Sequence, residues 1–246
     1  DLNLREDDSV VDPAIDLVND VRLRGDAALI ELPTRLDRYQ VRHGEDLEIP
    51  PTELKAAFDG LSKETSDALL LAQARIKDYH DRQTTDDMSF EDSLGNRLGQ
   101  RWTAVDRAGV YVPGGRAAYP SSVLMTITPA KCAGVQEVIL AVPTPDGERN
   151  PTVLAAAYVA GADRVFTIGG AQAIGALAHG TATGPKVDKI VGPGNAYVSA
   201  AKRHVGGNRV AVSLSPGPIL LSSRLSNGVQ PLPLRLNDVS CKDVPI

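Results

Sequence analysis

Three glycine-containing turns carry the side chains of this sequence that are best suited to bind a ligand. Each turn follows a short apolar run, and together they are Pro113-Gly114-Gly115, Gly169-Gly170-Ala171-Gln172 and Gly192-Pro193-Gly194-Asn195. Tyr111 lies just before the first turn, whereas Gln172 and Asn195 belong to the second and third. Glycine allows a ligand to approach the backbone, and phenol and carboxamide groups can hydrogen-bond to it. We therefore predict a binding site formed by Tyr111, Gln172 and Asn195.

Each of these features also has a purely structural interpretation. A single strand tyrosine such as Tyr111 more often fills the core than contacts a ligand. The glycines at 169–170 either permit a tight connection or open a helix N-terminus that attracts anions. Asn195 can serve as an N-cap, as a ligand contact, or as both. The GxGxxG fingerprint is absent. All three turns are expected at the ends of parallel strands, where ligands of α/β proteins bind. This shared position favours the ligand-binding interpretation over the structural one.

The turns belong to a strand–turn–helix unit that occurs four times between Val110 and Val205, with starts roughly 24 to 28 residues apart. The four apolar runs are Val110-Tyr111-Val112, Val138-Ile139-Leu140-Ala141-Val142, Val165-Phe166-Thr167-Ile168 and Lys189-Ile190-Val191. Ser121-Ser122 is expected to cap one connecting helix, which Pro129 interrupts or restarts. Asn150-Pro151 is expected to open another helix, and Gly161 to close it. The repeat predicts an α/β fold with a Rossmann-like parallel sheet and flanking helices.

The residues before this repeat predict a mainly helical region. Expected features are a helix with Asp12 as N-cap and Pro13 as its first residue, a break at Gly25, helices from Asp26 and Pro51, a helix over 62–80 and a hairpin over 89–102. The prolines and serines after Arg209 show no period. We therefore divide the chain into a helical N-terminal region of a split domain (1–102), a Rossmann-like domain (103–209) and an irregular tail (210–246).

Composition argues against several classes of protein. Residues 1–100 carry 23 acidic and 12 basic side chains, a balance of −11, whereas residues 101–246 carry 8 and 14, a balance of +6, which together give −5. An acidic chain without a Lys/Arg cluster is a poor nucleic-acid binder. No apolar run approaches the roughly 20 residues that span a bilayer. Two distant cysteines, Cys132 and Cys241, are expected to be inert thiols in a reducing cytoplasm.

Catalytic and metal-binding motifs are missing from the pattern. The histidines stand at 43, 80, 179 and 204, so that none forms HExxH or HxxxH. His43 and His80 lie in polar surroundings, and His179 and His204 suit ordinary positions at helix C-termini. From the residues alone we name no catalytic residue and no metal ligand.

The turns and their surroundings resemble those of the histidinol dehydrogenase family. The matching stretches are Arg22-Leu23-Arg24-Gly25-Asp26-Ala27-Ala28-Leu29, Ala108-Gly109-Val110-Tyr111-Val112-Pro113-Gly114-Gly115, Ile168-Gly169-Gly170-Ala171-Gln172-Ala173-Ile174 and Pro185-Lys186-Val187-Asp188-Lys189-Ile190-Val191-Gly192-Pro193-Gly194-Asn195-Ala196. The resemblance runs from about residue 10 to 205, roughly the first half of a family member. It implies a zinc-dependent cytoplasmic homodimer that oxidises L-histidinol to L-histidine through an aldehyde and passes two hydrides to two NAD molecules. The family's NAD contacts match Tyr111, Gln172 and Asn195.

The resemblance ends in the tail. The family continues with Gly-Pro-Ser-Glu, whose serine holds substrate, but here Gly217-Pro218 is followed by Ile219-Leu220. The family's zinc ligands and its Glu-His pair for proton transfer have no counterpart in this sequence. We therefore expect a chain that is inactive alone, produced by truncation or by a frame shift near residue 207. Its alternatives are a non-catalytic nucleotide-binding module and a folding remnant that binds nothing.

Overall fold

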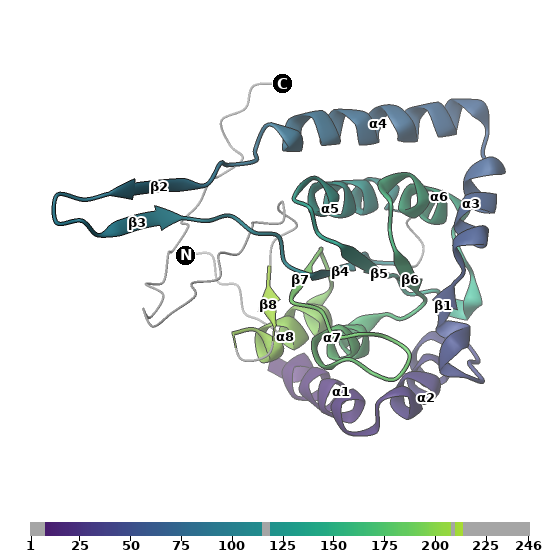
Figure 1. Ribbon diagram of the computed structural model, residues 1–246. Coiled ribbons are helices and arrows are strands. Elements are labelled where there is room, and N and C mark those ends of the chain that lie inside the picture. Colours follow the sequence, from purple (N-terminus) through teal and green to yellow (C-terminus); the bar gives the residue numbers. More distant parts are fainter. Residues whose placement is uncertain (1–7, 115–118, 208–209, 214–246) are drawn as a thin grey trace, which may run out of the picture.

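A mixed, mostly parallel six-stranded sheet forms the centre of the protein (Figure 1). The computed structural model describes residues 8–114, 119–207 and 210–213. Along the sheet the strands are β1 (Glu48–Ile49), β6 (Arg164–Phe166), β5 (Glu137–Ala141), β4 (Arg107–Tyr111), β7 (Lys189–Val191) and β8 (Ala211–Val212). All neighbouring pairs are parallel except β1 and β6. The predicted α/β class is confirmed, with one antiparallel edge strand that comes from the N-terminal region.

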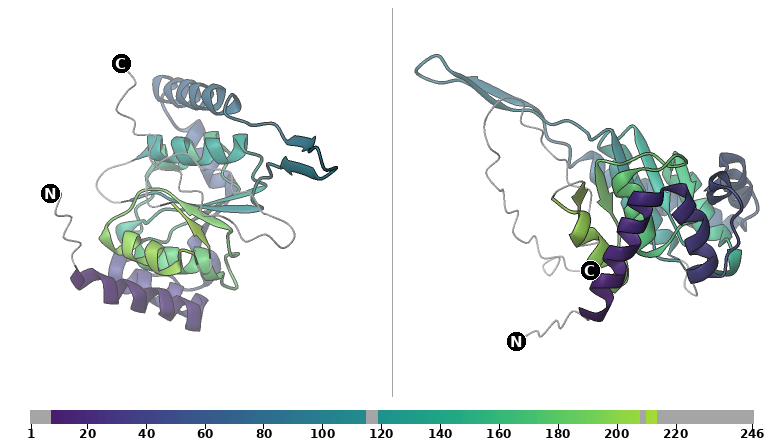
Figure 2. Two further views of the ribbon diagram at one scale, coloured as in Figure 1. Left: turned by 90° about the vertical axis from the view of Figure 1, so that its left-hand side faces the viewer. Right: turned by 90° about the horizontal axis from the view of Figure 1, so that it is seen from below.

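Helices cover both faces of this sheet in two layers each (Figures 1 and 2). On one face lie α5 (Pro120–Cys132) and α6 (Pro151–Ala160), with α3 (Pro51–Asp59) and α4 (Lys63–Asp81) outside them. On the other face lie α7 (Gly170–His179) and α8 (Ala196–Val205), with α1 (Val11–Arg24) and α2 (Asp26–Asp37) outside them. Short 3-10 turns occur at Asp8–Val10, Gly44–Leu47 and Pro145–Gly147. The N-terminal helices therefore wrap the sheet domain on both sides.

Strand residues alternate between two separate cores, as the pleat requires. Val110 and Leu140 pack toward α5 and α6, whereas Tyr111 and Ile139 pack toward α7 and α8. The chain runs β4–α5–β5–α6–β6 in one direction and then returns to place β7 on the other side of β4. The strand order thus reverses between β4 and β7, which is where ligands of open α/β sheets bind.

Local helix signals were confirmed at most of the predicted boundaries. The side chains of Ser62, Asn150 and Asn195 accept hydrogen bonds from first-turn amides of α4, α6 and α8. Gly25 separates α1 from α2, and Gly161 ends α6 in a left-handed conformation.

Three predictions near prolines and serines were wrong. Helix α1 begins at Val11 after a 3-10 turn, so Asp12 lies inside it instead of capping it. Helix α5 begins at Pro120, which suits the first position because its missing N–H needs no partner there, and Ser121-Ser122 therefore fall inside. The same helix continues through Pro129, and Met125, whose carbonyl loses its partner, is exposed to water.

A two-stranded hairpin extends away from the body of the molecule (Figure 2). It consists of β2 (Met88–Glu91) and β3 (Arg97–Gln100), which confirms the hairpin expected over 89–102. Within the described residues no helix is long and apolar enough to cross a membrane. Strand β8 pairs with β7 inside the segment expected as an irregular tail, while residues 214–246 of that segment lie outside the described residues.

Candidate functional site

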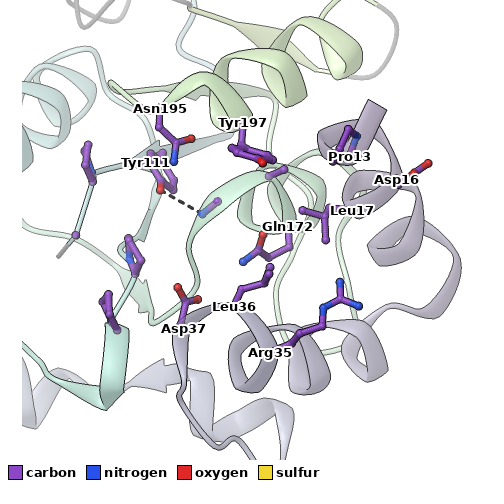
Figure 3. A pocket seen from close by; sticks show the side chains of 16 residues that line it. Pro13, Asp16, Leu17, Arg35, Leu36, Asp37, Tyr111, Gln172, Asn195 and Tyr197 are labelled. Carbon is purple, nitrogen blue, oxygen red and sulfur yellow. Dashed lines mark hydrogen bonds between the residues drawn. The ribbon is translucent and has the colours of Figure 1, made fainter. Parts of the chain in front are cut away.

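A cleft of about 810 Å³ opens at the carboxyl ends of the parallel strands, beside the point where the strand order reverses. Its floor comes from the segments that follow β4, β5, β6 and β7. Residues of α1 and α2 close it from the opposite side (Figure 3). The volume falls within the range of about 300–1,000 Å³ that is typical of small-molecule sites. Tyr111, Gln172 and Asn195 all line this cleft, as Figure 3 shows.

Tyr111 is the last residue of β4 and serves both the core and the cleft. Its side chain is only 4% exposed, and its ring packs with the core on the α7 face. Its hydroxyl oxygen accepts a hydrogen bond of 3.2 Å from the amide of Gly170. Burial and the negative charge of Asp37 raise the pKa of this hydroxyl, while the bond from Gly170 lowers it. The phenol therefore keeps its proton near neutral pH and can donate it to a ligand in the cleft.

Gln172 lies in the first turn of α7, and its side chain is 2% exposed. Among the described residues its Oε1 atom has no hydrogen-bond partner. An unsatisfied buried carbonyl oxygen costs roughly 1–3 kcal/mol, and buried polar atoms without partners usually have a role. The preceding Gly170 adopts a φ of +61°, and a Cβ atom there would come within 2.7 Å of that oxygen. Gln172 thus lines the cleft with a buried acceptor that has no partner among the described residues.

Asn195 performs the capping role and retains a group for a ligand. Its Oδ1 accepts a hydrogen bond of 3.1 Å from the amide of Val198 at the start of α8. The side-chain NH₂ group makes no hydrogen bond with the described residues and remains available as a donor in the cleft. The structural and the functional interpretations of this residue are therefore compatible.

The glycines of the turns are required by packing between strand ends. Gly192 has a φ of +108°, and a Cβ atom there would lie 1.9 Å from the carbonyl oxygen of Tyr111. A Cβ atom at Gly114 would lie 2.1 Å from the carbonyl oxygen of Pro143. These contacts bring the turns after β4, β5 and β7 together and shape the floor of the cleft. Gly115, the third residue of its predicted turn, lies outside the described residues.

The N-terminal helices supply cleft residues that the sequence patterns did not indicate. Asp37, the last residue of α2, is half-buried and lines the cleft with Leu36 and with Leu17 of α1. Burial raises the pKa of the Asp37 carboxyl group, and the charge of Arg38 opposes that effect. No sequence signal marked these residues, because only the packing of α1 and α2 brings them to the cleft.

A buried lysine supports the third glycine turn from below. Lys202 of α8 is 2% exposed, and its Nζ donates hydrogen bonds to the carbonyl oxygens of Gly192 and Ser213. Burial lowers the pKa of Lys202 to about 8. No carboxylate in the described part of the chain forms an ion pair with it. Its charge alone would have placed this lysine on the surface, although its spacing from Val198 and Val205 puts it on the buried face of α8.

Metal ligands were not predicted, and the described residues contain no group of three or more His, Cys, Asp or Glu side chains that could hold an ion. The described part of the chain therefore does not fit the zinc that the family resemblance implies, and we derive no chemical step through it. Cys132 is a half-buried free thiol whose pKa is raised by burial, while Cys241 lies outside the described residues.

Comparisons with known proteins match most of this chain to one family. A family model described as histidinol dehydrogenase matches residues 3–220. The histidinol dehydrogenase of Bordetella parapertussis is 56% identical over 213 residues, which are 87% of this chain and 48% of that protein. That of Hydrogenovibrio crunogenus is 53% identical over 211 residues, which are 86% of this chain and 48% of that protein. The chain spans about half the length of the curated relatives it matches.

The structural comparison gives the same family. The crystal structure of histidinol dehydrogenase from Elizabethkingia anophelis matches with a TM-score of 0.77 and 32% sequence identity. The match covers 82% of this chain and 46% of that chain.

Proposed function

Because this chain belongs to the histidinol dehydrogenase family, we propose that its cleft binds NAD through Tyr111, Gln172 and Asn195. In the complete enzyme this site would serve the oxidation of L-histidinol to L-histidine through the aldehyde, the last steps of histidine biosynthesis. The observation that carries the proposal is the convergence of the three side chains on one cleft from three different strand ends. These residues are far apart in sequence, so their meeting is a property of the fold.

The polar groups of the cleft suit a dinucleotide. Tyr111 offers a hydroxyl donor, Gln172 an unsatisfied oxygen and Asn195 an NH₂ group. Helix α7 begins at the cleft, and the partial positive charge at a helix N-terminus favours phosphate. When bound, NAD supplies the acceptor for the hydride. The residues described here bind and orient it, and the apolar side chains of α1 and α2 exclude water from one wall.

We further propose that this chain by itself binds NAD without turning over substrate. The alcohol must lose a proton as its hydride leaves, and this requires a positioned base. In the described residues the cleft carries no histidine, and no cluster of metal-binding side chains occurs. This favours a nucleotide-binding module over an active enzyme. Activity, the substrate L-histidinol, the homodimer and the cytoplasmic location are therefore proposed for the complete family protein.

Calorimetric titration of the 246-residue chain with NAD, combined with an assay of L-histidinol oxidation in the presence of zinc, tests both parts. We expect saturable binding of NAD at one site and no NADH formation above a control without protein. Absence of NAD binding would contradict the proposed binding site and would favour the alternative that the chain is a folding remnant that binds nothing. NADH formation that a chelator abolishes would contradict the proposed inactivity.

A further inference from the structure

Two carboxylates line the cleft, and they differ in orientation. Asp16 lies on α1 and is exposed, and in Figure 3 its side chain points away from the cavity. Asp37 lies at the end of α2, and its carboxylate points into the space beside Tyr111 and Gln172 (Figure 3). The charge of Asp37 also raises the pKa of the Tyr111 hydroxyl, which places the two groups within electrostatic reach.

The backbone fixes Asp37 in this position. Helix α2 ends at Asp37 because Arg38 adopts a left-handed conformation with a φ of +53°. The Arg38 guanidinium forms two bonds of 2.6 Å with the carboxylate of Asp146, on the segment after β5. Arg38 is thereby held on the carboxylate of Asp146 instead of on that of Asp37.

Asp37 is a half-buried acceptor without a donor of its own. In the described part of the chain no side chain or amide hydrogen-bonds to it, and burial is the main influence on its pKa. Removing a carboxylate from water without giving it donors is unfavourable. A ligand that brings hydroxyl groups to this position would supply them.

A ribose is the part of a dinucleotide that offers paired hydroxyl donors. In dinucleotide-binding folds an acidic residue shortly after the second strand usually accepts these hydrogen bonds. The second strand here is β5, and the residues after it that line the cleft are Pro143 and Pro145, which carry no acceptor in their side chains. Asp146, the next acidic residue, is already paired with Arg38. Asp37, which reaches the cleft from the N-terminal helices, is therefore the candidate acceptor for the ribose hydroxyls.

We propose that Asp37 accepts hydrogen bonds from both hydroxyls of the adenosine ribose and thereby selects NAD over NADP, an inference that rests on the proposed NAD site. In NADP the 2′-hydroxyl carries a phosphate. That substitution removes a donor and places a negative charge against the carboxylate. The adenosine ribose is the one assigned to Asp37, because it is the ribose that the acidic residue of dinucleotide-binding folds contacts.

Titrations of the 246-residue chain with NAD and with NADP test this assignment in four proteins: wild type, Asp37→Asn, Asp16→Asn and Arg35→Gln. Asp16→Asn is the matched control, because it makes the same change in a carboxylate that lines the cleft but points away. We expect wild type to prefer NAD. Asp37→Asn should lower the affinity for NAD about tenfold or more, because a hydrogen bond to a charged group is lost, and should reduce the preference over NADP by a similar factor. Asp16→Asn should leave both affinities unchanged.

The possible results separate the two proposals. If wild type does not bind NAD, the proposed function fails and this inference fails with it. If wild type binds NAD and Asp37→Asn retains both its affinity and its NAD preference, the ribose assignment alone is overturned. An equal loss of affinity for NAD and NADP in Asp37→Asn would also overturn it. So would a wild type that prefers NADP and loses this preference in Arg35→Gln, since Arg35 also lines the cleft and can pair with a phosphate.

Discussion

The hydroxyl oxygen of Tyr111 accepts a hydrogen bond of 3.2 Å from the backbone amide of Gly170. This bond joins the end of β4 to the first residue of α7, 59 positions later in the chain. It explains how a tyrosine whose ring is part of the core can also present its hydroxyl proton to the cleft. The Tyr111 side chain thus links the end of β4 to the start of α7 and also provides a candidate ligand contact.

Tyr111→Phe should weaken both the fold and the binding of NAD. The Gly170 amide loses its acceptor, which we expect to cost about 1 kcal/mol of unfolding free energy. The lost hydroxyl should lower the NAD affinity about tenfold if it donates to the ligand. Chemical denaturation and calorimetric titration measure the two effects. Tyr158→Phe is the control, because Tyr158 lies on α6, away from the cleft, and should not change NAD affinity.

Gln172→Met should separate stability from binding. The substitution removes a buried oxygen that has no partner in the described structure, so the unfolding free energy should stay equal or rise by about 1 kcal/mol. The affinity for NAD should fall at least tenfold, because the ligand loses its donor or acceptor on this side chain. The exposed Gln136 provides the same substitution outside the cleft. A variant that loses stability but binds NAD normally would show that Gln172 has a structural role only.

Asn195→Asp should retain the helix cap and reduce NAD binding. Aspartate caps helices about as well as asparagine, so stability should change by less than about 0.5 kcal/mol. The variant loses the NH₂ donor and adds a negative charge near the phosphates of the ligand. Titration should therefore show an affinity at least tenfold lower. Asn150→Asp, at the other capping asparagine, should bind NAD as wild type does, and equal behaviour of the two variants would speak against a ligand contact at Asn195.

Gly192→Ala should be the most damaging alanine substitution in the turns. A Cβ atom 1.9 Å from the Tyr111 carbonyl oxygen forces β4 and β7 apart, and a φ of +108° adds backbone strain. We expect a loss of about 3 kcal/mol or more, measured by denaturation. Gly207→Ala tests strain without a clash, because φ is +79° and no atom of the described residues lies within 4 Å of its Cβ position. Its cost should be about 1 kcal/mol, and equal losses in both variants would refute the packing argument.

Lys202 should make stability depend on pH in the alkaline range. Below its folded pKa of about 8 the folded protein bears the cost of a buried charge. Between about 8 and the ordinary value of 10.5 the folded chain releases the proton while the unfolded chain keeps it. Unfolding free energy should therefore rise with pH across this window, by up to about 3 kcal/mol from this residue.

The difference between wild type and Lys202→Met isolates that contribution, because Lys189, whose pKa burial also lowers, is present in both proteins. Denaturation at pH 7 and at pH 9.5 should show a smaller rise in the variant. Lys186→Met replaces an exposed lysine before β7 and should keep the rise seen in wild type. If the unfolding free energy of Lys202→Met and of wild type depended on pH in the same way, burial of the Lys202 ammonium group would not destabilise the folded protein.

The sequence alone was sufficient for features that depend on neighbours along the chain. Ser62 and Asn150 cap helices through amides two or three residues away, and the hairpin around Gly95-Asn96 closes on itself. The α/β class followed from the spacing of apolar runs and glycine turns, since strand and helix have different periods. Pro129 shows the limit of such signals, because α5 continues through this local helix breaker.

Only the tertiary structure decided what depends on contacts between distant segments. β1 pairs with β6 although Glu48 and Phe166 are 118 positions apart. The spacing of apolar residues in the sequence does not predict which distant strand β1 pairs with. The burial of Lys202 follows from the strand end and the chain after β8 that close over α8. Asp37 reaches the cleft because α1 and α2 pack against α7 and α8. Interactions between residues close in sequence determine where helices and strands form. The position of a side chain in a shared cavity depends instead on packing between segments that are distant in the sequence.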